Sequence, residues 1–251
     1  MEQALFLPSG ETPDLSGVDR LYLGAEFCPW TFPDLVEIRR GMQLARNASL
    51  PLTLVTPVFG EFFLASLQTI LAQVLPSFLP ADEIVISDWG AFLLIKKIAP
   101  HQEVVLGRAL SGQKRGPQIL DNTLAPEQLE YFQASRFHSS EVRLLLSELG
   151  VRRIELDYPP QGIAAIPPSL RGTLHAPFAM VTSSRNCPFR RGGGDRGCPA
   201  GCGEVFTLSS PQSPLPLLQG GNTQFIEIGE IPDNLTALGI DRLVTHVILP
   251  R

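Results

Sequence analysis

The chain has 251 residues, of which 44% are hydrophobic and 18% charged, and its formal net charge is −5. This size fits one globular domain with a large core, because barrels of roughly 250 residues are common single units. The acidic balance lacks the basic field of a non-specific nucleic-acid binder, so we do not expect nucleic acid as a partner, although a local basic patch remains compatible with one.

Short apolar segments alternate with helical patterns up to about residue 176. We expect strands at ALFL (4–7), RLYLG (20–24), LTLVT (52–56), EIVIS (83–87), EVVLG (103–107), RRIELD (152–157) and GTLHA (172–176). Helical patterns lie between them at 32–48, 61–75, 89–99 and 139–150, and the first and last have stop signals in Asn47 and Gly150. Strands rich in Val, Ile and Leu that are separated by helices indicate a parallel sheet covered on both faces.

These units predict an α/β fold of the TIM-barrel-like (β/α) type, incomplete or irregular, with ASRFH (134–138) as the candidate for the missing strand. After residue 176 the pattern changes, because prolines and glycines crowd the following segment. We predict a single domain over 1–251, with barrel units at 1–176, a Cys/Gly/Pro-rich loop at 177–221 and a strand-helix-strand tail at 222–251 that packs on the barrel.

The sequence predicts a cytoplasmic protein without a membrane span. Its N-terminal segment carries acidic residues where a secretory signal would have Lys or Arg. The most apolar region, 52–75, is interrupted by Pro57, Gly60 and Glu61, and so falls short of the ~20 continuous apolar residues of a span. In a reducing cytosol, cysteines are typically ligands or core residues rather than disulfides.

Three of the four cysteines, Cys187, Cys198 and Cys202, lie close together in a segment rich in glycine, proline and arginine. Cys28 follows the strand RLYLG, and Cys187 lies downstream of GTLHA. Because the C-terminal ends of the strands of a parallel barrel share one face, all four sulfurs can meet there. Unrelated buried thiols are the plain alternative.

A metal group explains the cysteine segment better than chance does. Proline follows Cys28, Cys187 and Cys198 and keeps the cysteine extended, and a Cys-Pro pair also ends the ferredoxin ligand run. The neighbouring glycines let the backbone approach a bulky group. A four-cysteine zinc site is the rival, but structural zinc usually takes two close cysteine pairs. Only Cys198 and Cys202 are so spaced, which favours an iron–sulfur cluster.

Five segments together resemble the collagenase-like peptidase family U32, from about residue 20 to the C-terminus. They are LYLGAEFC, VVLGRALSGQKRGPQI, HAPFAMVTSSRNCPF, CPAGC and GGNTQFIEI. Within this family the chain is most similar to the small UbiU/UbiV-like iron–sulfur members. The resemblance implies a 4Fe–4S cluster on Cys28, Cys187, Cys198 and Cys202, with zinc as the alternative cofactor.

The same resemblance implies oxygen-independent hydroxylation of a ubiquinone-precursor-like small molecule, with prephenate as the oxygen donor. The chain would act as a hydroxylase or as a hydroxylase subunit, in a heterodimer with a second family member. RNA-base hydroxylation, which other family members perform, is one alternative, and a non-catalytic partner with a structural cluster or zinc is another. GxSxG, HExxH and P-loop motifs are absent from the sequence, so we do not expect peptidase activity.

Polar residues at the predicted strand ends are candidates to line a substrate cavity, although such residues are commonly caps or solvated groups. They are Glu26, Thr56, Asp88, Arg108, Asp157 and His175, and the basic stretch after Arg108 adds Lys114 and Arg115. Four arginines near the cysteines could offset the charge of a cluster or hold an anionic substrate, with a solvated loop as the alternative. They are Arg185, Arg190, Arg191 and Arg196.

Three further features are interpreted as unrelated to function. Residues 192–197 match the GxGxxG pattern, but Cys198-Pro199 prevents a helix from following, so the match is accidental. His138 and His246 fall at a helix start and in an apolar terminal strand, and both are predicted to be structural.

Overall fold

The computed structural model describes residues 1–7, 13–115, 124–190, 197–211 and 213–250. Eight parallel strands form a closed barrel in the order β1-β12-β7-β6-β5-β4-β3-β2. The predicted TIM-barrel-like fold is confirmed, and all seven expected strands are present. The barrel strands are β1 (Glu2–Phe6), β2 (Arg20–Gly24), β3 (Leu52–Thr56), β4 (Glu83–Ile86), β5 (Val104–Leu106), β6 (Arg153–Asp157), β7 (Arg171–Ala176) and β12 (Ile240–His246).

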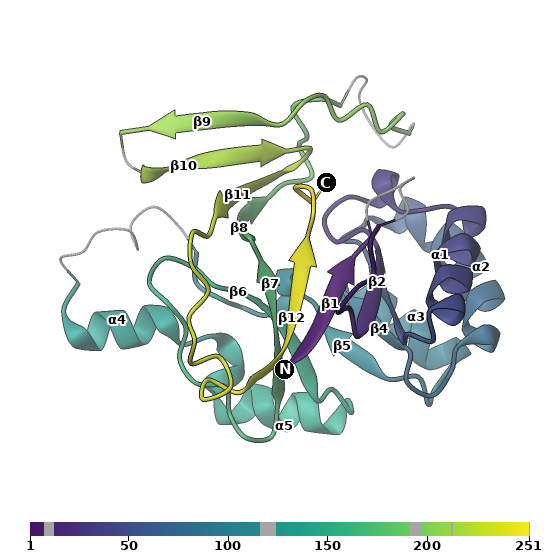
Figure 1. Ribbon diagram of the computed structural model, residues 1–251, viewed down its shortest axis with the longest axis horizontal. Coiled ribbons are helices and arrows are strands. Elements are labelled where there is room, and N and C mark those ends of the chain that lie inside the picture. Colours follow the sequence, from purple (N-terminus) through teal and green to yellow (C-terminus); the bar gives the residue numbers. More distant parts are fainter. Residues whose placement is uncertain (8–12, 116–123, 191–196, 212, 251) are drawn as a thin grey trace.

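Helices cover the barrel unevenly, as the expectation of an irregular barrel allows. The α-helices are α1 (Leu35–Asn47), α2 (Glu61–Val74), α3 (Trp89–Ile98), α4 (Pro126–Gln133) and α5 (Ser140–Glu148). The first three follow β2, β3 and β4 and gather on one side of the barrel (Figure 1). Between β6 and β7 the described chain forms no α-helix. Within the part of the chain that the structure describes, no helix has the length and apolar character of a membrane span.

Local signals fix the helix ends. The side chain of Asp34 accepts a hydrogen bond from the Glu37 amide, and the Glu37 side chain accepts one from the Asp34 amide, which forms a capping box at the start of α1. Asp88 caps α3 in a similar way through the Gly90 amide. The α5 helix gives way to Gly150, whose positive φ of 73° is typical of a helix stop.

A second, antiparallel sheet lies across the end of the barrel toward which β1 and β12 point (Figure 1). Its strands, in the order β8-β11-β10-β9, are β8 (Phe178–Ser183), β9 (Phe206–Ser210), β10 (Ser213–Gly220) and β11 (Thr223–Glu227). The segment 177–221, which the sequence predicts to be a loop, therefore contains three strands. The described residues between β8 and β9 form neither helix nor strand, so the cysteine segment itself is a loop.

The eighth barrel strand differs from the prediction. Residues 134–138 do not form a strand, because the Ser135 amide bonds to the His138 ring and folds Arg136–His138 into the short 3-10 helix η5. The strand β12 completes the barrel instead, pairing with β1 and β7, so this part of the tail belongs to the barrel wall. The helix expected before β12 is replaced by turns at 233–239. So short a segment forms too few helical hydrogen bonds to offset the free energy of helix nucleation.

Two different cores follow from this architecture. An extensive apolar core fills the space between the barrel and its helices. Inside the barrel, the described residues form one small buried apolar cluster, which consists of Ala4, Tyr22, Val55, Val85, Val105 and Val244. Other inward positions carry buried polar groups, although branched apolar residues usually fill such a barrel. These groups are Arg20, Thr53, Glu83, Arg153, Glu155, Thr173, His175, Arg242 and His246.

Candidate functional site

The first cysteine is held at the mouth of the barrel by the end of β2. Gly24 has a φ of +137°, and a Cβ there would overlap the Val55 carbonyl oxygen, so only glycine lets β2 pass this close to β3. Cys28 then adopts an extended conformation immediately before the 3-10 helix η1 (Pro29–Thr31). Its carbonyl accepts hydrogen bonds from the amide and the hydroxyl of Thr31, which fixes the turn.

Tight turns hold the later cysteines. The carbonyl of Cys187 accepts a hydrogen bond from the Arg190 amide at 3.1 Å. The Cys202 amide donates to the Ala200 carbonyl at 2.8 Å, and Ala200 has a positive φ of 54°. Gly203 follows with a φ of +70°, and a Cβ there would lie 2.5 Å from the Phe189 ring. The loop therefore depends on glycine to pass over this aromatic side chain.

Asn222 connects the two cysteine-bearing parts of the chain. Its side-chain amide donates to the carbonyl oxygens of Phe27 at 2.8 Å and Ser184 at 3.0 Å. The backbone carbonyl of Asn222 accepts a hydrogen bond from the backbone amide of Ser184. Phe27 precedes Cys28, and Ser184 lies shortly before Cys187, so this one residue fixes the distance between the two segments.

All four cysteines line one cavity of about 230 Å³, which the structure thus brings together from distant parts of the sequence. None of the four forms a disulfide, and each is partly exposed. The aromatic rings of Trp30 and Phe62 stack on one another at the cavity wall, with centroids 4.9 Å apart. Arg185 and Arg190 also line the cavity, whereas Arg191 and Arg196 and most of the glycine pattern at 192–197 lie outside the described residues.

Electrostatics disfavour a free thiolate at Cys28. Burial raises the pKa of its thiol, and negative charge at Cys202 and Cys198 raises it further, while the amides of Trp30 and Thr31 act in the opposite direction. A bound cation would remove this repulsion, because metal ligation requires and stabilises deprotonated cysteine. The role of the cysteines as metal ligands stays a prediction.

Several predicted substrate residues lie in a buried ion-pair network. Arg108 is fully buried and donates to Glu26, to Asp157 at 2.9 Å and to the Phe178 carbonyl at 3.0 Å. Arg115 pairs with the other oxygen of Asp157 at 2.6 Å. Burial opposes the charge on Arg108, but Glu26 and Asp157 outweigh it and raise its pKa. In this arrangement Arg108 connects the ends of β2 and β6 to β8 through its hydrogen bonds to Glu26, Asp157 and Phe178.

Other candidates for substrate binding contact backbone groups of the protein, as helix caps and structural side chains commonly do. Lys114 donates to the Ala134 carbonyl and lies over the Tyr131 ring at 4.2 Å, which directs it toward α4. The Thr56 hydroxyl donates to the Val85 carbonyl, and Asp88 caps α3. His138 bonds to backbone groups, which agrees with the structural role predicted for it.

The histidines at the barrel mouth form an arrangement that the sequence reasoning missed. His175 lies 2.7 Å from His246 and 2.8 Å from Glu155 between the bonding atoms, and all three are buried. The sequence predicts a tail strand at His246, but the alternation of Arg242, Val244 and His246 is typical of a strand that faces a barrel interior.

A second cavity of about 430 Å³ adjoins this cluster. Glu26 and His246 line it, together with apolar residues such as Phe6, Phe32 and Leu249. Trp30, Ala200 and Cys202 line both this cavity and the cysteine cavity. A molecule bound here would therefore lie between the polar groups of the barrel mouth and the cysteines.

Comparison with known proteins identifies the fold. No protein-family model matches the chain, and no curated protein matches it. Among solved structures, the U32 peptidase Mk0906 is similar over 100% of this chain and 94% of that chain, with a TM-score of 0.50 and 13% sequence identity. This identity is too low to carry function. The chain therefore has the fold of a U32 peptidase, in agreement with the family that its sequence motifs resemble.

Proposed function

We propose that the chain binds a 4Fe–4S cluster through Cys28, Cys187, Cys198 and Cys202 and takes part in oxygen-independent hydroxylation as a UbiU/UbiV-like protein. The observation that carries this proposal is that every cysteine of the chain borders the same cavity, although Cys28 is remote in sequence from the other three. Unrelated thiols would have no physical reason to gather there.

The spacing of the sulfurs supports a cluster over zinc. A tetrahedral zinc ion with Zn–S bonds of about 2.3 Å would hold its sulfurs about 3.8 Å apart. Among the described residues, one set of three metal-ligating side chains has its ligand atoms within 4.8 Å of one another. That set consists of Glu26, His175 and His246 and contains no cysteine. The four cysteines instead border a cavity of about 230 Å³, which has room for an inorganic group larger than one ion.

The surroundings support the same group. A cluster on four thiolates is negatively charged when oxidised, and Arg185 and Arg190 at the cavity wall can offset that charge and tune its potential. Four cysteine ligands leave no open iron, so the group would supply electron transfer rather than bind the substrate. The four cysteines would hold the cluster, and the stacked rings of Trp30 and Phe62 would form an aromatic wall beside it.

The adjoining cavity supports an apolar aromatic substrate. Its wall combines apolar side chains with the carboxylate of Glu26 and the imidazole of His246, which suits a hydrophobic ring with polar substituents such as a ubiquinone precursor. The net charge of −5 disfavours the RNA alternative, which would need a basic surface.

The test of the cofactor is anaerobic purification followed by iron, sulfide and zinc analysis and an absorption spectrum. We expect a coloured protein with iron and acid-labile sulfide in equal amounts, and a spectrum that reductant bleaches reversibly. A colourless protein that contains zinc and no iron would refute the cluster. A cluster that resists reduction would instead support the non-catalytic partner.

The test of the activity uses the loaded protein under anaerobic conditions, with a prenylated phenol and prephenate. We expect mass spectrometry to show a product heavier by one oxygen atom, both with the chain alone and with a second family member added. The Cys187→Ser protein without its cluster is the matched control and should give no product. Equal product formation with and without the cluster would contradict a redox role.

A further inference from the structure

Glu26, His175 and His246 bring one ligand atom each into a group whose members lie within 4.8 Å of one another. All three side chains are buried at the barrel mouth. Two imidazoles and one carboxylate, with positions left open, are a ligand set that binds divalent iron and related first-row ions. We propose that these three residues bind one divalent transition-metal ion, at a site separate from the cysteines and independent of any cluster there.

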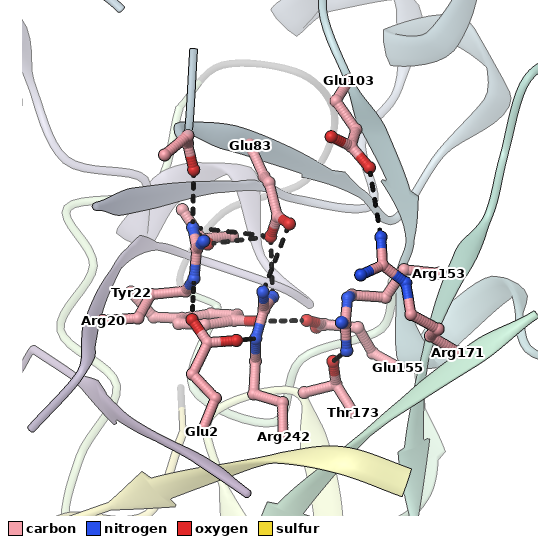
Figure 2. Close-up of polar contacts among 12 residues, drawn as sticks. Glu2, Arg20, Tyr22, Glu83, Glu103, Arg153, Glu155, Arg171, Thr173 and Arg242 are labelled. Atoms are coloured by element: carbon pink, nitrogen blue, oxygen red, sulfur yellow. Dashed lines mark hydrogen bonds and ion pairs between the residues drawn. The ribbon is translucent and has the colours of Figure 1, made fainter. Parts of the chain in front are cut away.

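The second ring nitrogen of His175 has the partner that a metal-bound histidine needs. Its Nε2 lies 2.8 Å from Glu155, so its Nδ1 faces His246 and the proposed ion. Histidine ligands almost always donate their other ring N–H to a carboxylate or a carbonyl, which fixes the ring. Glu155 is itself fixed, because it accepts a hydrogen bond from Tyr22, which in turn accepts one from Arg242 (Figure 2).

The carboxylate of Glu26 keeps capacity for a metal ion. Both of its oxygens accept hydrogen bonds from Arg108, which prevents the side chain from turning away. Each carboxylate oxygen has two lone-pair positions, so one can accept from the guanidinium while another binds a cation. Arg108 also pairs with Asp157, which shares its positive charge between two carboxylates.

The charge balance of the barrel interior favours a cation at this end. At the N-terminal ends of the strands, Arg20 and Arg242 balance Glu2 and Glu83. Around the proposed site the charged groups are the carboxylates of Glu26, Glu155 and Asp157 and the guanidiniums of Arg108 and Arg115. Three negative groups face two positive ones, so one negative charge is left for a cation to offset.

A proton shared by His175 and His246 would offset the same charge and is the rival explanation. The geometry favours a metal ion, because a carboxylate oxygen of Glu26 converges with the ring nitrogens of both histidines to within 4.8 Å, which sharing a proton between the two rings does not require. Access is also available, because the cavity of about 430 Å³ reaches both Glu26 and His246 and leaves room for water or a substrate atom as a further ligand.

Cobalt(II) is the probe that tests this site. The protein is first loaded with its cluster so that the cysteines are occupied, and it is then titrated with Co²⁺ by calorimetry and visible spectroscopy. We expect one equivalent to bind, with ligand-field bands but no thiolate-to-cobalt charge-transfer band. The exposed His101 provides the matched control, and His101→Gln should bind cobalt like the wild type.

Variants locate the ion. His246→Gln and His175→Gln should weaken cobalt binding by at least about 100-fold, and Glu155→Gln by roughly 10–100-fold, because it removes only the partner of a ligand. The same samples should retain iron and sulfide, which separates this site from the cysteine site. If no cluster forms, the titration is repeated with all four cysteines changed to serine.

Two results would overturn the proposal. One is that the protein binds no cobalt, either loaded with its cluster or with all four cysteines changed to serine, although a cooperative melting transition shows that it is folded. The other is His246→Gln binding cobalt as tightly as the His101→Gln control. Either result would assign the excess charge to a proton on the histidine pair.

Discussion

The barrel interior and the cysteine cavity are neighbouring regions with opposite chemistry. In the interior, buried charged groups have partners within the protein, such as Arg242 with Glu83 and Arg108 with Asp157. In the cavity, four thiols gather without a disulfide, and burial, with a smaller contribution from Cys202 and Cys198, raises the pKa of Cys28 and disfavours its thiolate. The charged groups of the interior are therefore paired largely with one another, whereas we propose that the cavity holds a group that the chain itself does not supply.

The largest effect should come from the cavity. Cys187→Ser and Cys198→Ser should each lose most of the iron of anaerobically purified protein, because serine is a poor ligand for a cluster. The free energy of unfolding of the cluster-free protein should change by roughly 1 kcal/mol or less, since these side chains are only partly buried. Iron analysis measures the loss of the cluster, and denaturant unfolding measures the free energy of unfolding. An equal iron content in variant and wild type would contradict the assignment.

In the interior, Arg242→Met should reduce the free energy of unfolding by about 3–5 kcal/mol, because it leaves the carboxylates of Glu2 and Glu83 with the single guanidinium of Arg20. Arg242 bonds to Glu83 and Glu2, each at 2.6 Å. The control is Arg171→Met, whose exposed pair with Glu103 spans 3.9 Å and should contribute about 0–1 kcal/mol (Figure 2). Denaturant unfolding measures both, and similar losses would refute the contrast between buried and exposed pairs.

Between the two regions, Asn222→Ala should reduce the free energy of unfolding by roughly 1–3 kcal/mol, because carbonyls near Cys28 and Cys187 lose their donor. Bound iron should also be released faster to a chelator, since the two segments are no longer joined. The exposed Asn186 gives the control, and Asn186→Ala should behave like the wild type. Unchanged iron release in Asn222→Ala would show that this tie is unimportant.

A smaller, graded effect should follow acidification. Burial opposes ionisation of Asp157, but Arg108, Arg115 and the Met180 amide outweigh it and lower its pKa below the ordinary value of 3.8. The stability that this ion contributes is therefore fully present above about pH 3.8 and is lost as the pH falls through the lower folded-state pKa. Asp157→Asn should be less stable than the wild type at neutral pH, and this difference should shrink in acid. Unfolding free energies measured against pH test this, and a constant difference would contradict it.

The sequence predicts the regular part of the fold well. Apolar strands and amphipathic helices repeat from β1 to β7, and their signals are local. The last strand is harder, because β12 carries Arg242 and His246 on its inward face and pairs with β1 at the opposite end of the chain. The second sheet is hidden for another reason. Its strand β10 contains prolines, and its register shifts between Ser213 and Leu217, so it lacks the usual strand pattern.

The candidate site shows the same division. The cysteines could be predicted to meet, because each follows the C-terminal end of a strand or lies in a loop beyond one. The ion-pair network of Arg108 could not be predicted, because its pairing with Glu26 and Asp157 depends on three strands that are far apart in the sequence. Nor could the group of Glu26, His175 and His246 be predicted, because it requires β12 to stand in the barrel wall.

The most direct test is the iron content of Cys28→Ser, purified without oxygen beside the wild type and Cys187→Ser. If a thiol from the β2 loop joins three from the loop after β8, this variant should lose iron and sulfide as fully as Cys187→Ser does. Full retention of iron in Cys28→Ser, with loss in Cys187→Ser, would contradict the shared four-cysteine site.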